Sequence, residues 1–178
     1  MASTPPEMLP DAHLQAIGSE HAEAMNRWLS DPELAEALGV HREVSLEETS
    51  RWIARAVSDP GIHAFAVLCG GEHVGNVVLD QMDEHLSTVR LSIYIGDSAQ
   101  RGRGLGDAAV ALALDQAFER LGVHKVWLTV HVENERAIAL YGRCGFEREG
   151  VLKGEFLLGG RRIDAVRMAA FRAGGKGG

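Results

Sequence analysis

The chain has 178 residues, of which 46% are hydrophobic and 24% charged, a composition ordinary for a single globular domain with a real core. Its 18 Lys and Arg residues are outnumbered by 25 Asp and Glu, and the net charge of −7 excludes a general nucleic-acid binder with a basic face. The same charge favours a cationic substrate, or it simply keeps the protein in solution.

The apolar stretches are shorter than the roughly 18 to 20 residues of a membrane span, and the N-terminus lacks a secretory pattern, so we expect no membrane association and a cytoplasmic location. Cys69 and Cys144 are expected to be inert, buried thiols. We predict a loose lead-in over residues 1–10, one domain over 11–172 and a flexible, glycine-rich tail over 173–178.

In the first half, Ser19 is the expected N-cap of a helix that ends near Leu29. Ser45 stands three residues before Glu48, which is the capping-box signature of a helix that ends near Val57. Three strands are predicted next, the first two forming an antiparallel hairpin and the third extending it: Ile62–Leu68, Val74–Leu79 and Thr88–Ile95.

In the second half, helical and strand patterns alternate before the chain closes with two strands that turn at Gly159-Gly160. The predicted elements are a helix over Asp107–Leu121, a strand over Val126–Val130, a helix after Asn134, and strands over Glu147–Leu158 and Arg161–Ala170. This order predicts an α+β fold with mixed sheet polarity.

The segment Arg101-Gly102-Arg103-Gly104-Leu105-Gly106 joins a predicted strand to a predicted helix. Its glycines let the backbone take positive φ and approach a ligand, and the N–H groups at the start of the following helix favour an anion such as phosphate. Gly104 and Gly106 with Ala109 also satisfy the dinucleotide fingerprint, but three strands and two helices precede them and no acid follows at the required place. A Walker loop is excluded because no Gly-Lys-Ser/Thr follows.

Together with this loop, Asn134, Ala137, Leu140, Tyr141 and Gly145-Phe146 make residues 88–170 resemble the GCN5-related N-acetyltransferase (GNAT) superfamily. Within it, the segment from Gly150 to Met168 resembles the branch of ribosomal-protein N-terminal, spermidine and amino-sugar acetyltransferases. The resemblance implies a single α+β domain whose twisted, mostly antiparallel sheet is flanked by helices and splays apart at the cofactor site.

The resemblance further implies acetyl-CoA as co-substrate, with its pyrophosphate on the glycine loop and its pantetheine arm paired with a strand edge. The residues expected to bind it are Ile93, Tyr94, Ile95, Arg101, Gly102, Arg103, Gly104, Leu105, Gly106, Asp107, Asn134, Ala137 and Tyr141. Asp107 fits this role least well, because its carboxylate competes with an anionic ligand for the helix N-terminus. Its alternative role is that of a simple helix cap.

Tyr141 is the expected catalytic acid, because a phenol can protonate the thiolate that leaves a thioester. The general base stays open, because Arg90, Ser92 and Thr129 stand where relatives often carry a glutamate. The candidates for the base are His131 and Glu133 at the end of the strand over Val126–Val130, Glu155 directly or through a water chain, and the loop residues Asp83, Glu84 and His85. The residues expected to border the acceptor pocket beside helices from 20–57 are Asp83, Glu84, His85 and His131.

The expected function is transfer of an acetyl group to a primary amine by direct attack in a ternary complex. A non-catalytic acyl-CoA-binding regulator of the same fold, or a structural partner protein without a ligand, is the alternative. Among the eight histidines, no two have the helical spacing of metal ligands beside a carboxylate or cysteine, so we predict no metal site. The acceptor is left open among a protein N-terminus, a polyamine, an amino sugar and an aminoglycoside. Assembly into a homodimer is also left open.

Overall fold

A computed structural model describes residues 11–40, 42–96 and 102–174. Its strands are β1 (Ala12–Ala16), β2 (His63–Cys69), β3 (Glu72–Asp83), β4 (Thr88–Ile95), β5 (Lys125–His131), β6 (Glu147–Leu158) and β7 (Arg161–Phe171). Its helices are α1 (Ala22–Leu29), α2 (Pro32–Ala37), α3 (Leu46–Ser58), α4 (Leu105–Asp115) and α5 (Glu135–Arg143), with a 3₁₀ turn η1 (Ser19–His21) and a π-helical turn η3 (Gln116–Arg120).

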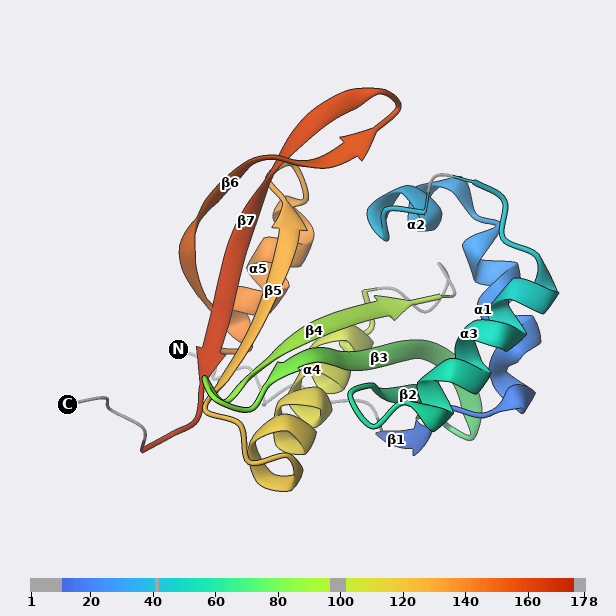
Figure 1. Ribbon diagram of the computed structural model, residues 1–178, viewed down its shortest axis with the longest axis horizontal. Coiled ribbons are helices and arrows are strands. Elements are labelled where there is room, and N and C mark those ends of the chain that lie inside the picture. The colour runs from blue at the N-terminus through green and yellow to red at the C-terminus, as the bar shows by residue number, and fades with distance from the viewer. Residues whose placement is uncertain (1–10, 41, 97–101, 175–178) are drawn as a thin grey trace, which may run out of the picture.

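The strands form one seven-stranded sheet in the order β1-β2-β3-β4-β5-β7-β6 (Figure 1). All neighbouring strands are antiparallel except β4 and β5, which run parallel. The predicted α+β class with a mixed, mostly antiparallel sheet flanked by helices is confirmed.

The parallel pairing between β4 and β5 is short. β4 and β5 pair only where Thr88–Arg90 meets Lys125–Trp127. Beyond this point β4 continues along β3 as far as Ile95, and β5 continues along β7 as far as His131. The expected splay in the sheet therefore lies between the C-terminal halves of β4 and β5.

Helices cover the two faces of the sheet at different places, as Figure 1 shows. On the face that we call the α4 face, α4 and α5 pack on a core that includes Val89, Leu91 and Leu128. On the opposite face, which we call the α1 face, Trp28 and Ile53 bring α1 and α3 onto the half of the sheet that contains β1 to β4. Because side chains alternate along a strand, successive residues of β4, and likewise of β5, point to opposite faces of the sheet.

The predicted hairpin, the third strand and the two closing strands are confirmed to within a few residues. The helix expected from Ser19 begins instead as η1 and becomes α-helical at Ala22. The helix expected over 107–121 begins at Leu105 and passes into η3. β1 and α2 were not predicted, and residues 1–10 and 175–178, which hold the expected lead-in and most of the tail, lie outside the described residues.

β6 lies at one edge of the sheet and is not straight. Its register with β7 shifts between Arg148 and Gly150 and again between Leu152 and Phe156. Gly154, inside the second shift, has φ +60, a conformation that favours glycine. Such bulges bend a strand and increase its twist.

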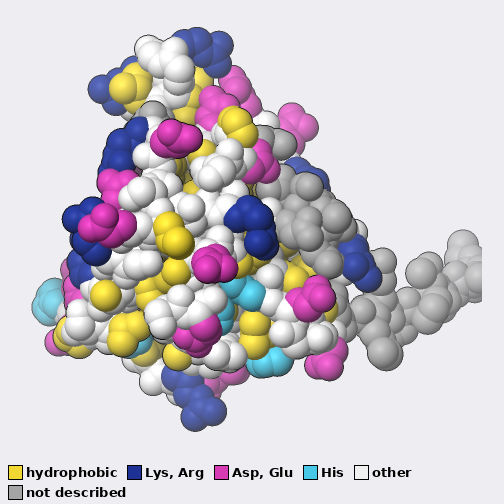
Figure 2. Space-filling view, turned by 90° about the vertical axis from the view of Figure 1, so that its right-hand side faces the viewer, with side chains coloured by type: hydrophobic (Ala, Val, Ile, Leu, Met, Phe, Trp, Pro, Cys, Tyr) yellow, Lys and Arg dark blue, Asp and Glu magenta, His cyan; other side chains and the backbone are white. Residues whose placement is uncertain are grey.

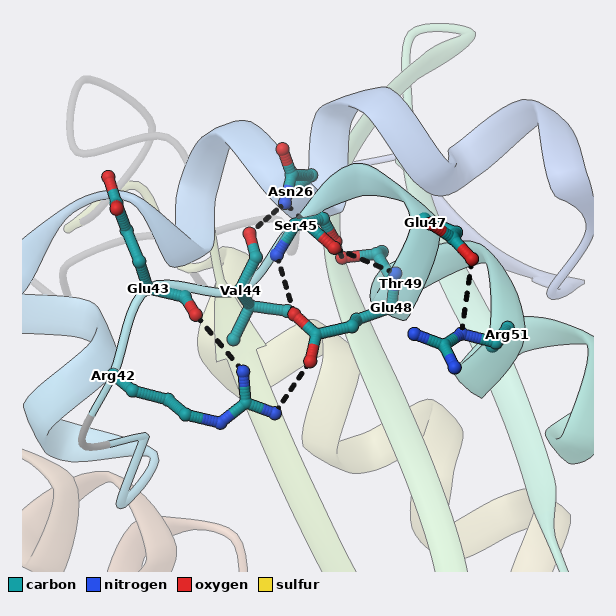
Figure 3. Close-up of polar contacts among 9 residues, drawn as sticks. All are labelled: Asn26, Arg42, Glu43, Val44, Ser45, Glu47, Glu48, Thr49 and Arg51. Atoms are coloured by element: carbon teal, nitrogen blue, oxygen red, sulfur yellow. Dashed lines mark hydrogen bonds and ion pairs between the residues drawn. The ribbon is translucent and has the colours of Figure 1, made fainter.

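The predicted capping box of α3 is present (Figure 3). The Ser45 hydroxyl accepts from the Glu48 backbone N–H at 3.2 Å, and the Glu48 carboxylate accepts from the Ser45 N–H at 2.9 Å. Arg42 pairs with Glu48 at 2.8 Å and lowers the pKa of that carboxyl to about 2, with the Ser45 N–H acting in the same direction. Asn26 of α1 donates to the Val44 carbonyl at 2.6 Å, which joins this cap to α1.

We expect Ser45→Ala to lower the free energy of unfolding by about 1 kcal/mol, because the first turn of α3 loses the acceptor for one N–H. Chemical denaturation of both proteins measures the difference. Ser50→Ala, an exposed change inside the same helix, is the matched control and should leave stability nearly unchanged. Equal losses in the two variants would contradict a specific role for the cap.

Candidate active site

A cavity of about 950 Å³ lies where β4 and β5 part. Its lining comes from α2, β4, the glycine loop, β5, α5 and β6: Leu34, Leu38, Arg90, Leu91, Ser92, Ile93, Tyr94, Ile95, Gly102, Arg103, Gly104, Gly106, Asp107, Thr129, Val130, His131, Asn134, Arg136, Ala137, Ala139, Leu140, Tyr141, Arg143 and Phe156. Residues from both faces of the sheet take part, so the cavity passes through the gap between the strands. This volume is at the upper end of the usual range for ligand pockets.

The glycine loop forms the end of the cavity on the α4 face. Gly102 and Gly104 have φ of +82 and +76, and Gly104 is the N-cap of α4. A side chain at Gly106 would meet the Leu140 Cδ1 atom at 2.5 Å, so a glycine here lets α4 pack closely on α5. The first-turn N–H groups of α4 and the positive end of its dipole therefore form a backbone cradle that suits an anion.

Arginine side chains surround this end of the cavity, which we call the cofactor end. Arg103, Arg136 and Arg143 line it. Arg143 also binds the carboxylate of Asp107 through two bonds, from Nε at 3.0 Å and from Nη2 at 3.1 Å. The charge of Asp107 at the helix N-terminus is thereby balanced, so its competition with an anionic ligand is reduced.

Most residues expected to bind the cofactor line the cavity together, including Ile93, Tyr94 and Ile95 on the edge of β4 that no longer faces β5. Leu105 is the exception, because its side chain is 2% exposed in the core beneath α4 and does not line the cavity. Arg101 lies outside the described residues.

Tyr141 and Asn134 come from α5. The Asn134 Oδ1 atom accepts from the Ala137 N–H at 3.1 Å, which confirms Asn134 as the N-cap. Tyr141 lines the cavity and packs against Phe146, with ring centroids 5.6 Å apart. Burial raises the pKa of its phenol to about 12, with a smaller contribution from Cys144, so the hydroxyl carries its proton throughout the neutral range.

The end of the cavity on the α1 face, which we call the acceptor end, has a different lining. His131 lies at the end of β5, on the opposite side of the strand from the core residue Val130. The centroid of its ring lies 4.2 Å from that of Phe156 of β6, and Leu34 of α2 with Leu38, just after α2, completes this apolar wall. In Figure 1, α2 faces the β6–β7 hairpin across this end.

His131 is uncharged at neutral pH. Burial lowers the pKa of its imidazole, while the carboxylates of Glu36 and Glu133 act in the opposite direction. Its Nε2 atom is buried and has no hydrogen-bond partner among the described residues. A neutral imidazole with a vacant ring nitrogen is suited to accept a proton.

Arg90 also lines the acceptor end, and it is held by Asp80 of β3 in a bidentate pair with contacts of 2.8 and 2.7 Å. The guanidinium side chain is 33% exposed and the carboxylate 20%, so the pair is partly shielded from water. This arrangement fixes Arg90 and neutralises most of its charge.

Several residues expected at the site lie outside the cavity. Asp83, Glu84 and His85 lie around the turn between β3 and β4, which is at the end of β4 where β5 is still paired, and none lines the cavity. Glu155 is exposed on β6 next to Phe156 and does not line the cavity either. Strand alternation turns Glu155 away when Phe156 faces inward.

Other lining residues were not singled out from the sequence, chiefly Leu34, Leu38, Arg136, Arg143 and Phe156. The two arginines are seven residues apart on one helix and so share a face, which is a signal that could have found them. Phe156 stands before Leu157 and Leu158 in the sequence, so no alternation of apolar and polar residues marked it as an inward position. Leu34 of α2 and Leu38 just after it carried no such signal, because α2 is too short for a helical period.

Comparison with known proteins agrees with this geometry. The sequence profile of the acetyltransferase (GNAT) domain matches residues 12–147, and the chain belongs to this family.

Spermidine N(1)-acetyltransferase of Escherichia coli strain K12 is 32% identical over 152 residues, which cover 85% of this chain and 76% of that protein. The L-amino acid N-acetyltransferase AaaT of the same strain is 32% identical over 120 residues, covering 66% of this chain and 74% of that protein. The crystal structure of spermidine N-acetyltransferase from Vibrio cholerae in complex with CoA and spermine superimposes with a TM-score of 0.85 at 26% identity, covering 90% and 95% of the two chains.

Within the described parts of the chain, no three His, Cys, Asp or Glu side chains gather as a metal ion would require. No helix there is long and apolar enough to cross a membrane. The absence of a metal cofactor stays a prediction.

We expect Gly104→Val to weaken the binding of coenzyme A at least tenfold, because a β-branched residue does not tolerate φ +76 and the first turn of α4 must shift. Isothermal calorimetry measures the affinity. Gly122→Val is the matched control, since Gly122 has φ +68 with open space around it and does not line the cavity. Equal affinities in the two folded variants would exclude the loop as the anion site.

Proposed function

We propose that the protein moves the acetyl group of acetyl-CoA to a primary amine by direct attack, with both substrates bound in the cavity between β4 and β5. The observation that carries this proposal is one continuous cavity with an anion cradle at one end and a vacant, neutral imidazole at the other. A protonated phenol lines the same cavity.

The cofactor end suits coenzyme A in its chemistry. The pyrophosphate would lie on the N–H groups from Gly102 to Asp107, with the three arginines around it. The edge of β4 at Ile93 and Tyr94 would offer backbone groups to the amide groups of the pantetheine arm, as another strand would. The same part of β4 would hold the thioester between the cofactor end and the acceptor end of the cavity.

In the reaction, the amine nitrogen bonds to the thioester carbonyl carbon and the C–S bond breaks. The departing thiolate takes the proton of the Tyr141 hydroxyl, and the nitrogen loses a proton to His131. Burial raises the proton affinity of a thiolate as it does that of the phenol, so the difference between their pKa values governs the transfer. Water then restores both side chains.

We expect Tyr141→Phe to lower kcat by about a hundredfold to ten-thousandfold while the affinity for coenzyme A is unchanged, because the hydroxyl acts only as the thiolate leaves. Steady-state kinetics and calorimetry give the two quantities. Tyr94→Phe removes the other tyrosine hydroxyl, which is buried, and keeps the backbone groups through which Tyr94 is expected to bind the cofactor, so it should change kcat no more than a few-fold. A kcat within a few-fold of wild type for Tyr141→Phe would leave thiolate protonation to water.

We expect His131→Gln to remove the acid limb of the pH–rate profile. In the wild type, activity falls as pH drops through the lowered pKa of His131, because the protonated ring cannot accept a proton. Glutamine keeps polarity and does not titrate. His124→Gln changes an exposed histidine just before the other end of the same strand and should keep that limb. An unchanged acid limb in His131→Gln would assign the proton acceptor to another group.

A non-catalytic acyl-CoA-binding regulator would need the cradle but neither Tyr141 nor His131 in the cavity, so their placement favours the enzyme. The cytoplasmic location and the homodimer stay predictions. A relative is described as dodecameric, the spermidine N-acetyltransferase from V. cholerae, so assembly into oligomers occurs among similar proteins.

A further inference from the structure

The charges that line the cavity are divided between its two ends. All the described lining residues that carry a charge at neutral pH are Arg90, Arg103, Asp107, Arg136 and Arg143. The single carboxylate among them, Asp107, belongs to the cofactor end and is bound by Arg143. The described lining of the acceptor end therefore contains no carboxylate.

The charged group that does line the acceptor end is the guanidinium of Arg90. Asp80 accepts from its Nε and Nη2 atoms, which leaves further N–H donors on the same side chain. Such donors suit a carbonyl or carboxylate oxygen, whereas a second ammonium group finds no acceptor on this side chain. A polyamine, which carries several ammonium groups, would have to bury one of them without an anionic partner.

Carboxylates do stand outside this end. Glu36 and Glu133 are close enough to His131 to affect its pKa, but both are exposed, and Glu133 faces Arg161 at 3.9 Å. On the side of the molecule that carries α1 and α3, acidic and basic side chains are interspersed (Figure 2). Exposed carboxylates in water attract an approaching amine weakly and do not replace a buried partner.

The rest of the acceptor end is apolar. Leu34 is 7% exposed, and with Leu38 and Phe156 it offers a hydrocarbon surface beside the imidazole of His131. Ser92 and Thr129 add hydroxyl groups without charge. An amine that carries an apolar group would bury that group here, and each buried methylene would favour it over a polar competitor.

The proton chemistry favours the same kind of amine. At pH 7 roughly one in six α-amino groups at the N-terminus of a peptide is already uncharged, against about one in 2,500 groups of the lysine type. A neutral histidine of lowered pKa is a weak base and suffices only for the first kind.

We propose that the acceptor is the α-amino group of a hydrophobic amino acid or of a peptide with a hydrophobic first residue, and that Leu34, Leu38 and Phe156 select it against polyamines. This inference rests on the proposed acetyl transfer and specifies its substrate class. The neighbouring carbonyl or carboxylate oxygen of the acceptor would take a hydrogen bond from Arg90.

The test is a comparison of kcat/KM with acetyl-CoA for phenylalanine, the peptides Phe-Gly-Gly and Asp-Gly-Gly, and spermidine, followed by release of coenzyme A and by mass of the product. We expect Phe-Gly-Gly or phenylalanine to exceed both Asp-Gly-Gly and spermidine by about tenfold or more. The comparison of the free amino acid with the peptide distinguishes the two sources of the α-amine. A preference for spermidine would overturn the inference and leave acetyl transfer intact.

A charge placed in the apolar wall should reverse the preference. We expect Leu38→Glu to lower kcat/KM for Phe-Gly-Gly about tenfold or more and to raise that for spermidine. Leu86→Glu is the matched control, because Leu86 is 62% exposed in the turn before β4 and does not line the cavity. Equal behaviour of the two variants would overturn the role of this wall.

Binding of coenzyme A separates the remaining outcomes. A Leu38→Glu variant that binds coenzyme A as the wild type does is folded, so its acceptor kinetics are interpretable. If the wild type binds coenzyme A but none of the amines is acetylated, the proposed function itself fails, and this inference fails with it.

Discussion

The functional architecture depends on the early parting of β4 and β5. Each strand keeps one antiparallel partner beyond that point, β3 for β4 and β7 for β5, so neither loses all its hydrogen bonds when the two separate. The released edges expose backbone groups that a ligand can satisfy. The gap also connects the α4 face to the α1 face, which brings a helix N-terminus and an apolar wall into one cavity. A sheet paired along its whole length would keep these two surfaces apart.

Two bidentate ion pairs then set the electrostatic character of each end. The Asp107–Arg143 pair is largely solvated, with the guanidinium side chain 59% exposed, and such pairs contribute at most about 1 kcal/mol to stability. The pair cancels the negative charge of Asp107 beneath the loop, and this charge would otherwise repel a bound phosphate. The Asp80–Arg90 pair is better shielded and holds a donor at the acceptor end without leaving a net charge there.

Local sequence pattern predicted those parts of the fold that local interactions determine. The box of Ser45 and Glu48 and the cap at Asn134 form within one turn of chain, and both are present as predicted. β1 was not predicted because its sequence, AHLQA, has little β-propensity and depends on β2 for its conformation. The splay was expected from family resemblance, since strand pairing is non-local and leaves no periodic signal.

The candidate site could be predicted from the sequence to about the same extent as the fold. The loop and α5 lie close to one another in sequence and in space, so most of their residues were correctly placed in one cavity. The turn at Asp83–His85 lies away from the gap because the direction of β4 decides which end of the strand meets the gap, and composition alone does not reveal that direction. Leu34 and Leu38 reach the site only through the tertiary position of α2.

The two register shifts of β6 affect how this protein behaves in a crowded solution. The hairpin of β6 and β7 borders the acceptor end, and its outer strand exposes Val151 and Leu157 at 53% and 44%. A long, straight edge with apolar side chains is a template on which other chains add strands and aggregate. The bulges at Gly150 and Gly154 bend this edge, and the charge of Lys153 between them is 84% exposed. The chain can therefore keep an extended hairpin beside its substrate cavity with little tendency to form intermolecular β-sheet.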